Sequence, residues 1–327
     1  MSPSDPRVVV VVPVRNRRDL LRRALDALDR QEVDDFEVVV VDDGSTDGAD
    51  EEATARPVRG RPVRLLRSDG QGAVAARRLA VASTDAPLLA FTDSDCEPDP
   101  AWLGAALDRL DAGADLVHGR TMPARPVRPL ERSVNEGDGG LFPTCNLAVT
   151  RAAYDAVGGF DPAAGSRWGF RPSARAKGLG FGEDTTFGWA VARRFRADYE
   201  EAMVVRHHVF GADLREWIGR SWQVGAFPAL VREVPELRRT MLRHGVLFTA
   251  RSRVPVYATV LALATRRPPL IALALGWWVV HRYRRSVRPA GLPVAEQARL
   301  LPAELLLDLI QSGALVAGSV KARTLLL

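Results

Sequence analysis

The sequence predicts an α/β fold, in which a mostly parallel sheet is flanked by helices and followed by a helical C-terminal region. Over the first two-thirds of the chain, apolar strand-like runs alternate with helical segments, as βαβ units require. Polar side chains recur where these runs end. Later, arginine-rich apolar helices replace the alternation. We therefore expect an α/β domain at 1–210 and a helical region at 211–327.

The individual elements follow from the spacing of apolar residues. Runs that are apolar throughout are typical of strands buried on both faces, whereas leucine or alanine at a spacing of three to four residues predicts a helix. Strands are expected at Val8–Val12, Phe36–Val41, Val63–Leu66, Pro87–Phe91, Asp115–His118 and Phe142–Val149. A last strand is expected to end with Val204–His208. Helices are expected at Asp19–Leu28, Ala73–Ala82, Pro100–Leu110, Arg151–Val157 and from Glu183.

Composition limits the class of protein. The 327 residues carry 45 Lys and Arg against 40 Asp and Glu, and the excess is arginine, since Lys177 and Lys321 are the only lysines. A mildly basic chain suits a phosphate-bearing ligand or an anionic membrane surface. No nucleic-acid partner is expected. With only Cys96 and Cys145 present, we expect a reducing compartment, and the N-terminus does not resemble a signal peptide.

The stretch Leu88–Glu97 ends an apolar run in two carboxylates, Asp93 and Asp95. Ligands of open α/β sheets bind outside the carboxyl ends of the strands. Two adjacent carboxylates repel each other unless a cation lies between them, and hard divalent cations prefer oxygen ligands. The motif alone is equally consistent with a turn that caps the following helix.

A second acidic pair, Asp42 and Asp43, follows the apolar run Phe36–Val41. It is either a turn or an acceptor for the N–H groups of a base and the hydroxyls of a ribose. Gly70–Gly72 then opens a helix and can offer free N–H groups to a phosphate, with Arg77 and Arg78 further along. Two acidic motifs in consecutive βα units favour a nucleotide-sugar pocket.

Further candidates lie in the second half of the α/β region. Glu183 and Asp184 open a helix, where its dipole stabilises carboxylates, and a general base can stand at such a junction. His207 and His208 end the last strand-like run and can be interface residues or metal ligands. The segments Met122–Gly140 and Gly165–Gly182 lack periodicity and are expected to be loops, of which the second could fold over a substrate.

The order of these motifs resembles the family 2 glycosyltransferases of the GT-A fold. The resemblance covers roughly the first two-thirds of the chain, and the ordered set is more specific than any one motif. The matching segments are Val11–Asn16, Val40–Asp47, Gly72–Arg77, Phe91–Asp95, Asn146–Val149, Gly158–Asp161 and Gly182–Asp184.

The resemblance implies an inverting transferase that uses a nucleoside-diphosphate sugar, with UDP as the expected nucleotide. Asp184 would be the catalytic base, and Glu183 its neighbour in the acceptor pocket. Asp95, Asp93 and His207 (or His208) would hold manganese or magnesium, which bridges the diphosphate. Asp43 would contact the base, and Asp93 would also lie near the ribose. The donor-binding residues implied in this way are Pro13, Asn16, Asp42, Asp43, Gly72, Arg77, Asp93 and Asn146.

One position departs from the family, because Arg78 stands where asparagine is usual, which puts the local phosphate or ribose contact in question. Two other functions are considered. A sugar nucleotidyltransferase has a similar sheet, but the glycine-rich, basic signature after its first strand is missing here. A degenerate, non-catalytic transferase domain acting as an assembly partner is disfavoured by the intact Asp95 and Asp184.

The C-terminal region contains two strongly apolar segments, Val254–Ala264 and Leu270–Val280, split by Arg266–Pro269. Each has roughly half of the ~20 residues that a spanning helix needs, and no part of the chain has that length uninterrupted. A re-entrant or interfacial hairpin on an anionic leaflet is expected, with core or dimer helices as the alternative. Leu300–Leu315 is a further apolar stretch, and the last five residues form an apolar tail. The acceptor is expected to be a cell-envelope or lipid-linked glycan, or a small molecule, reached from the cytoplasm or the inner membrane face.

Overall fold

The computed structural model describes residues 6–168, 181–211, 214–248, 253–284 and 294–326. These residues form two compact units. The first comprises the described parts of Met1–Ala124, Val134–Arg167 and Ala176–His208, and the second those of Arg125–Ser133, Trp168–Arg175 and Val209–Leu327. Most of the expected loop Gly165–Gly182 lies outside the described residues.

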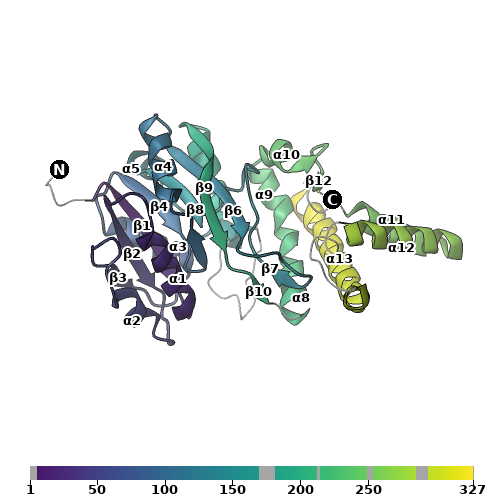
Figure 1. Cartoon of the computed structure of the whole chain (residues 1–327). Coiled ribbons are helices and arrows are strands. Elements are labelled where there is room, and N and C mark those ends of the chain that lie inside the picture. Colours follow the sequence, from purple (N-terminus) through teal and green to yellow (C-terminus); the bar gives the residue numbers. More distant parts are fainter. Residues whose placement is uncertain (1–5, 169–180, 212–213, 249–252, 285–293, 327) are drawn as a thin grey trace. The chain divides into compact units, whose positions relative to one another are not determined.

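The first unit is built on an eight-stranded sheet, as the alternation of elements predicts (Figure 1). Its strand order is β3-β2-β1-β4-β8-β6-β9-β5. Strands β3, β2, β1 and β4 are mutually parallel, whereas β8 runs antiparallel to both β4 and β6. The strands are β1 (Val8–Val14), β2 (Phe36–Asp42), β3 (Arg64–Arg67), β4 (Leu88–Thr92), β5 (Cys96–Pro98), β6 (Leu116–Pro123), β8 (Asn146–Thr150) and β9 (Ala197–His207).

Helices cover both faces of this sheet, and the reason is visible in β1. All seven of its residues are buried, with Val8, Val10, Val12 and Val14 in one core and Val9 and Val11 in the other. The helices on the first face are α1 (Arg18–Asp29), α2 (Ala49–Thr54) and α4 (Trp102–Asp111). Those on the second face are α3 (Ala73–Ala82), α5 (Arg151–Ala156) and α7 (Glu183–Ala192). The short α6 (Ala164–Arg167) also belongs to this unit.

The sequence located most of these elements within a few residues of their bounds. Helix α2 and the short strand β5 were not predicted, and β9 begins at Ala197 and is paired with β6 along its length, apart from an irregularity after Gly119. The reason is that the segment Ala197–Ala202 is only half-buried and carries Asp198, Glu200 and Glu201, so it lacks the apolar signal of a central strand.

The second unit is mainly helical. Its strands are short: β7 (Glu131–Arg132) pairs with β10 (Phe210–Gly211), and β11 (Leu242–Arg243) with β12 (Leu247–Phe248). Its helical segments are α8 (Leu214–Gln223), the 3-10 turn η2 (Val224–Ala226), α9 (Phe227–Glu233), α10 (Leu237–Thr240), α11 (Val254–Thr265), α12 (Pro268–Arg282) and α13 (Val294–Ala322).

Helix α13 packs closely against η2. A Cβ on Gly318 would lie 2.1 Å from the Gly225 carbonyl oxygen, so only glycine permits this approach. Among the described residues, one helical stretch, Ala298–Ala322, is long and apolar enough to cross a membrane, in contrast to our expectation. A third of its most apolar window, 33%, is buried, and a single such helix is weak evidence for a span.

Candidate active site

The polar residues that follow β1 and β2 meet at one edge of the sheet, because parallel strands bring their carboxyl ends together. The backbone N–H of Asn16 donates to Ser45 Oγ at 2.9 Å, and Asn16 Oδ1 accepts from the Thr46 N–H at 2.8 Å. Asn16 has a positive φ of 51°, a conformation that asparagine tolerates better than most residues. The observed role of Asn16 is therefore to tie the two loops together.

Asp42 and Asp43 both organise loops. Asp42 Oδ1 accepts from the Ser45 N–H at 3.0 Å, which is the turn contact that the sequence allowed. Asp43 is only 3% exposed and accepts from Ser68 Oγ at 2.6 Å. It also accepts from the N–H groups of Gln71 and Gly72, each at 2.9 Å. The expectation that these two N–H groups are free for a phosphate is therefore wrong for this structure, because Asp43 occupies both.

Arg77 carries a buried positive charge into the same edge from α3. Its side chain is 4% exposed, and its Nη2 lies 2.5 Å from Asp93 Oδ1. Burial acts to lower the pKa of Arg77, but the charges of Asp93, Glu183 and Asp184 outweigh it, and the pKa is raised. Arg77 thus links the Asp93 motif to the Glu183–Asp184 pair, although β4 and α7 are far apart in the sequence.

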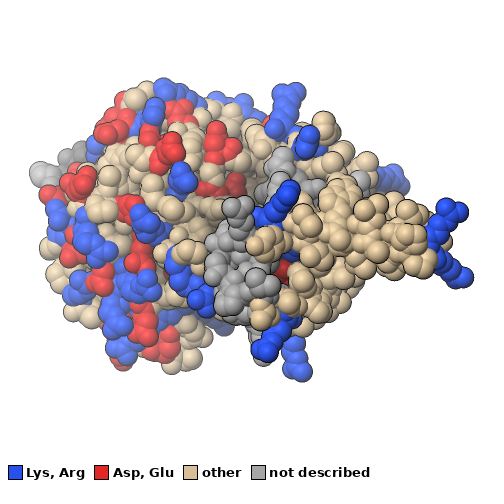
Figure 2. Space-filling view, turned by 45° about the vertical axis from the view of Figure 1, so that its right-hand side comes forward, with Lys and Arg blue, Asp and Glu red and all other residues tan. Residues whose placement is uncertain are grey.

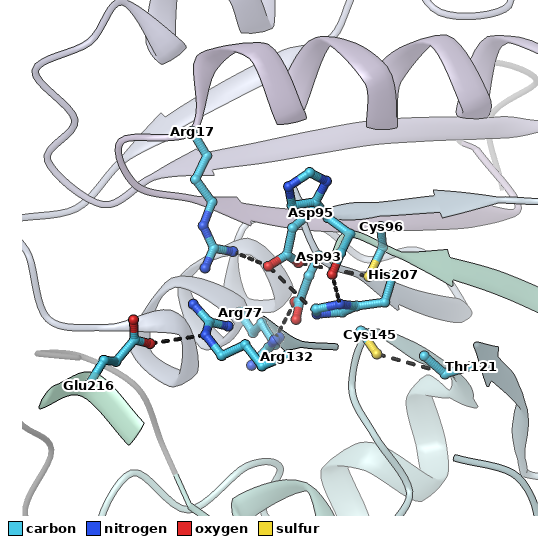
Figure 3. Close-up of polar contacts among 11 residues, drawn as sticks. Arg17, Arg77, Asp93, Asp95, Cys96, Thr121, Arg132, Cys145, His207 and Glu216 are labelled. Carbon is cyan, nitrogen blue, oxygen red and sulfur yellow. Dashed lines mark hydrogen bonds and ion pairs between the residues drawn. The ribbon is translucent and has the colours of Figure 1, made fainter. Parts of the chain in front are cut away.

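Asp95 is surrounded by potential partners (Figure 3). Arg17 Nη1 donates to Asp95 Oδ2 at 2.5 Å, and His207 Nε2 lies 3.7 Å from the same oxygen. The antiparallel pairing of β5 with β9 sets Cys96 opposite His207, which explains how a residue more than a hundred positions away reaches the motif. The side chains of Asp95 and His207 are only 5% and 8% exposed.

The tautomer of His207 follows from its second ring nitrogen. Nδ1 lies 2.7 Å from the carbonyl oxygen of His208, and a carbonyl oxygen can only accept, so Nδ1 carries the hydrogen. With Nδ1 engaged in this way, Nε2 is the ring nitrogen that faces Asp95 and could serve as a metal ligand. His208 contributes its backbone instead, with its N–H donating to the Asp95 carbonyl oxygen at 2.8 Å. The geometry favours His207 over His208.

Asp95, Cys96 and His207 each offer one potential ligand atom, and these atoms lie within 4.8 Å of one another. Burial, reinforced by the Cys145 thiol and the Asp95 charge, raises the pKa of Cys96 well above its usual value. Cys96 is therefore a thiol, a poor ligand for a hard cation. One carboxylate and one imidazole fit manganese or magnesium as part of a larger donor set. Asp93 lies outside this group of three.

Glu183 and Asp184 occupy the first turn of α7. Asp184 Oδ1 accepts from the Thr185 N–H at 2.8 Å, and Thr185 Oγ1 donates to the Leu141 carbonyl oxygen at 2.9 Å. Burial, reinforced by the Glu183 charge, raises the pKa of Asp184 to about 7, and burial also raises the pKa of Glu183. Glu183 Oε2 is buried with no hydrogen-bond partner among the described residues. The pair is suited to exchange a proton near neutral pH.

Two of the expected donor-binding residues are structural. Asn146 is 0% exposed, with its Oδ1 accepting from Trp102 Nε1 at 2.8 Å and its Nδ2 donating to the Met203 carbonyl oxygen at 3.0 Å. Both polar atoms are thus engaged inside the core, and the expectation for Asn146 is corrected. Pro13 is buried within β1, opposite Val41 on β2, and its ring offers no donor.

The sequence analysis missed Arg17 and Cys96. Arg17 lies shortly after the end of β1, next to Asn16, at the sheet edge where the other site residues gather. A basic residue at that position was the signal that could have identified it. The Cys96 contact depends on the β5–β9 pairing and had no local signal. Arg78, the position that departs from the family, donates to the carbonyl oxygens of Gly158 and Phe160 at 3.3 and 2.9 Å, so here it braces a glycine turn.

Comparison with known proteins finds similarity to glycosyltransferases. Residues 9–160 match the family model "Glycosyl transferase family 2". Glycosyltransferase AglE of Haloferax volcanii is 34% identical over 123 residues, covering 36% of this chain and 40% of the relative. The pre-mycofactocin glycosyltransferase of Mycobacterium tuberculosis is 27% identical over 267 residues, covering 75% of this chain and 52% of the relative. The chain thus spans about half or less of the length of these curated relatives.

Solved structures share the fold at low sequence identity. The mannosyltransferase PcManGT from Pyrobaculum calidifontis, in complex with GDP-Man and Mn2+, has a TM-score of 0.53 at 19% identity, covering 98% of this chain and 88% of that one. Residues 1–349 of S. aureus TarS, in complex with UDP-GlcNAc, have a TM-score of 0.53 at 17% identity, covering 97% and 92%. The chain thus matches the family 2 model over a little under half of its length and shares the GT-A fold of these glycosyltransferases.

Proposed function

We propose that this protein transfers a sugar from a nucleoside-diphosphate sugar to an acceptor hydroxyl with inversion at the anomeric carbon. The donor diphosphate binds at the edge formed by Asp93, Asp95 and His207, with a divalent cation as cofactor. Asp184 is the base, and Glu183 lies beside it. The donor nucleotide is proposed to be of the UDP type.

One observation carries this proposal: Arg77 pairs directly with Asp93, and the charges of Glu183 and Asp184 also act on its guanidinium. This supports a single site that contains both the donor motif and the base motif. A transferase needs this arrangement, because the acceptor hydroxyl must be deprotonated next to the anomeric carbon. Neither a turn at Asp93 nor a helix cap at Asp184 would require a shared buried cation.

The reaction balances with the groups present. The acceptor oxygen forms a bond to the anomeric carbon, while the bond from that carbon to the diphosphate oxygen breaks. The nucleoside diphosphate leaves with the electron pair, and the acceptor proton moves to the Asp184 carboxylate. A base with a pKa near 7 is ionised in a large fraction of molecules at neutral pH and still accepts a proton readily.

Asp95 and His207 would hold the cation, together with donor oxygens. When bound, a divalent cation balances the charge that develops on the departing diphosphate. Arg17 pairs with Asp95 in this structure and contributes a positive charge to the same place. The Mn2+ in the PcManGT complex supports a metal-dependent reaction for the present chain.

The acceptor is proposed to be a cell-envelope or lipid-linked glycan, reached at the cytoplasmic face of the membrane. A small-molecule acceptor is the alternative. The basic, apolar C-terminal helices support the first choice, because they suit a site of action near a lipid surface.

The donor can be identified by thermal shift with a panel of UDP- and GDP-sugars, with and without Mn2+. Stabilisation by one donor, increased by the cation, is expected. Calorimetry on Asp95→Ala should then show that Mn2+ no longer strengthens donor binding. Asp19→Ala, in an exposed helix pair with Arg22, is the control. If Asp95→Ala binds the donor with unchanged affinity and the same dependence on Mn2+, Asp95 has no role in holding the cation.

The reaction class is tested separately by identifying the product released from the donor. Release of a nucleoside diphosphate supports transfer of the sugar, whereas release of pyrophosphate during synthesis of a nucleotide sugar would establish a nucleotidyltransferase. Binding of a donor without turnover on any offered acceptor would favour the non-catalytic alternative.

A further inference from the structure

The α11–α12 hairpin exposes an unusual amount of apolar surface. Among the described residues, most of the large hydrophobic side chains that are strongly exposed lie on α11, α12, α13 or the ends of these helices. Leu261 and Leu273 are 69% and 72% exposed. The hairpin members of this group are Val260, Leu261, Leu263, Leu270, Leu273, Trp277, Val279, Val280 and Tyr283. So many exposed apolar side chains on two neighbouring helices indicate an interaction site.

Only one side of the hairpin is held by the second unit. Trp278 is 3% exposed, and its Nε1 donates to Asp308 Oδ2 of α13 at 3.0 Å. Arg282 lies 3.3 Å from Glu304 and 3.7 Å from Asp308, which anchors the base of α12 on α13. Leu261 and Leu273 have no such cover among the described residues. Figure 2 shows a tan projection at its right-hand side with basic side chains at its end.

The segment that contains the hairpin carries charge of one sign. The sequence from Leu237 to Ala295 contains eleven arginines and neither Asp nor Glu. Arg266 and Arg267 stand at the turn between the two helices and Arg284 at the other end, whereas Arg282 is paired with Glu304 and Asp308. A second copy of this chain docked through the same face would bring like charges together. An anionic lipid surface complements both the charge and the apolar side chains.

Helix length and the position of the arginines select an orientation. At 1.5 Å per residue, α11 with 12 residues and α12 with 15 are ~18 and ~22 Å long, shorter than the ~30 Å hydrocarbon core. Insertion tip first would place Arg266 and Arg267 deep in the hydrocarbon, which is strongly unfavourable. If the hairpin lies flat, both arginine-bearing ends remain at the headgroups. Trp277 and Tyr283, 48% and 45% exposed, are residues that favour this interface.

We propose that the α11–α12 hairpin lies flat in the surface of an anionic lipid leaflet, with Leu261 and Leu273 in the acyl region and the arginines of its two ends at the headgroups. The hairpin is thus a membrane anchor that does not cross the bilayer. This inference is independent of the transfer reaction, since the donor site can be intact in a protein that binds no lipid.

The first test is co-sedimentation of the full chain with vesicles. Binding to an equal mixture of phosphatidylcholine and phosphatidylglycerol is expected, with little binding to phosphatidylcholine alone. The double variant Leu261→Glu, Leu273→Glu should lose binding. The control Leu79→Glu, at a 39% exposed leucine of α3 in the first unit, should retain it. Replacing Arg266 and Arg267 with Gln should weaken binding roughly 30-fold, since each arginine near an anionic surface contributes about fivefold.

Each alternative has its own outcome. Equal binding to both kinds of vesicle would overturn the anionic requirement, and equal loss of binding in the Leu79→Glu control would overturn the assignment to the hairpin. No binding to vesicles, with a dimer in light scattering that the Leu261→Glu, Leu273→Glu variant abolishes, would assign the surface to a second copy.

The second test measures orientation. Cys96 and Cys145 are buried, so a cysteine introduced as Arg266→Cys is the accessible thiol among the described residues. A membrane-impermeant maleimide added outside intact anionic vesicles should label it at a rate close to that of the lipid-free protein. If labelling occurs only after detergent is added, the tip lies within or across the bilayer and the flat orientation is wrong.

Discussion

The raised pKa of Asp184 makes a quantitative prediction about stability. Because one pKa unit corresponds to about 1.36 kcal/mol, a rise from 3.8 to about 7 corresponds to about 4 kcal/mol. The folded pKa lies above the unfolded one, so the native state binds the proton more tightly. At low pH the Asp184 carboxyl is protonated in both states and does not affect the free energy of unfolding. As the pH rises from about 4 to about 7, its ionisation in the unfolded state lowers the free energy of unfolding progressively.

Asp184→Asn removes the charge and keeps the shape. The asparagine oxygen can still accept the Thr185 N–H that Asp184 accepts at 2.8 Å. The variant should exceed the wild type in free energy of unfolding by about 4 kcal/mol at pH 8 and by only about 1 kcal/mol at pH 4.5. For a unit of 150–250 residues, about 4 kcal/mol corresponds to a rise in Tm of about 8–16 °C.

Thermal unfolding followed by near-ultraviolet circular dichroism at the two pH values measures this difference. Asp161→Asn is the matched control, because Asp161 Oδ1 also accepts a backbone N–H, that of Ala163 at 2.8 Å, but on the surface. It should change stability by less than about 1 kcal/mol at either pH. The same Asp184→Asn protein should lose about 10²- to 10⁴-fold in turnover and keep its donor affinity.

A gain for Asp184→Asn that does not increase with pH would refute the buried-carboxylate account. Near-normal turnover would remove Asp184 as the base, whatever its effect on stability. The two readouts are separable, because a residue that is only a helix cap would affect stability without affecting the chemical step.

Three further predictions concern the scaffold of the site and of the second unit. Arg77→Met removes the buried cation that pairs with Asp93 and should lower the free energy of unfolding by ~3–5 kcal/mol. The control Arg22→Met, in an exposed pair, should lower it by less than about 1 kcal/mol. Equal losses for the two variants in denaturant titrations would contradict the importance of the buried pair. Asn146→Ala leaves the Trp102 N–H and the Met203 carbonyl without partners and should cost roughly 2–4 kcal/mol. Its donor affinity by calorimetry should stay unchanged, and a large loss of affinity would restore Asn146 to the binding site. Gly318→Ala should lower the Tm because the new Cβ would meet the Gly225 carbonyl oxygen. Gly313→Ala in the same helix has open space around it and should raise the free energy of unfolding by up to ~1 kcal/mol. A similar change in Tm for both variants would argue against the close contact.

Much of the fold is encoded locally. The runs Val8–Val14 and Phe36–Asp42 are apolar on both faces, which only a sheet covered on both sides accommodates, and α3 occupies the residues 73–82 that its spacing predicts. The carboxyl-end rule then places Asp43 and Asp93 at one edge of the sheet. Period and position along the chain are sufficient for these conclusions.

The contacts that define the site are not local. The pairing of β5 with β9 brings His207 to Asp95, and Arg77 of α3 pairs with Asp93 while the charges of Glu183 and Asp184 act on it. Asn146 occurs in a segment that matches the family motif, but packing turns both of its polar atoms inward. Asp43, likewise, holds the N–H groups that the local sequence offers to a phosphate.

The sequence by itself determined the fold class, the order of the elements and the carboxylates that gather at one edge of the sheet. These follow from residue periodicity and from the polarity of parallel strands, and both are properties of a short stretch of chain. Only the tertiary structure decided which histidine faces Asp95, which cations neutralise Asp93 and Asp95, and why Asp184 holds its proton to about pH 7. Those depend on burial and on distances of a few ångströms between residues remote in sequence, because the strength of a charge interaction is set by separation and solvent exposure.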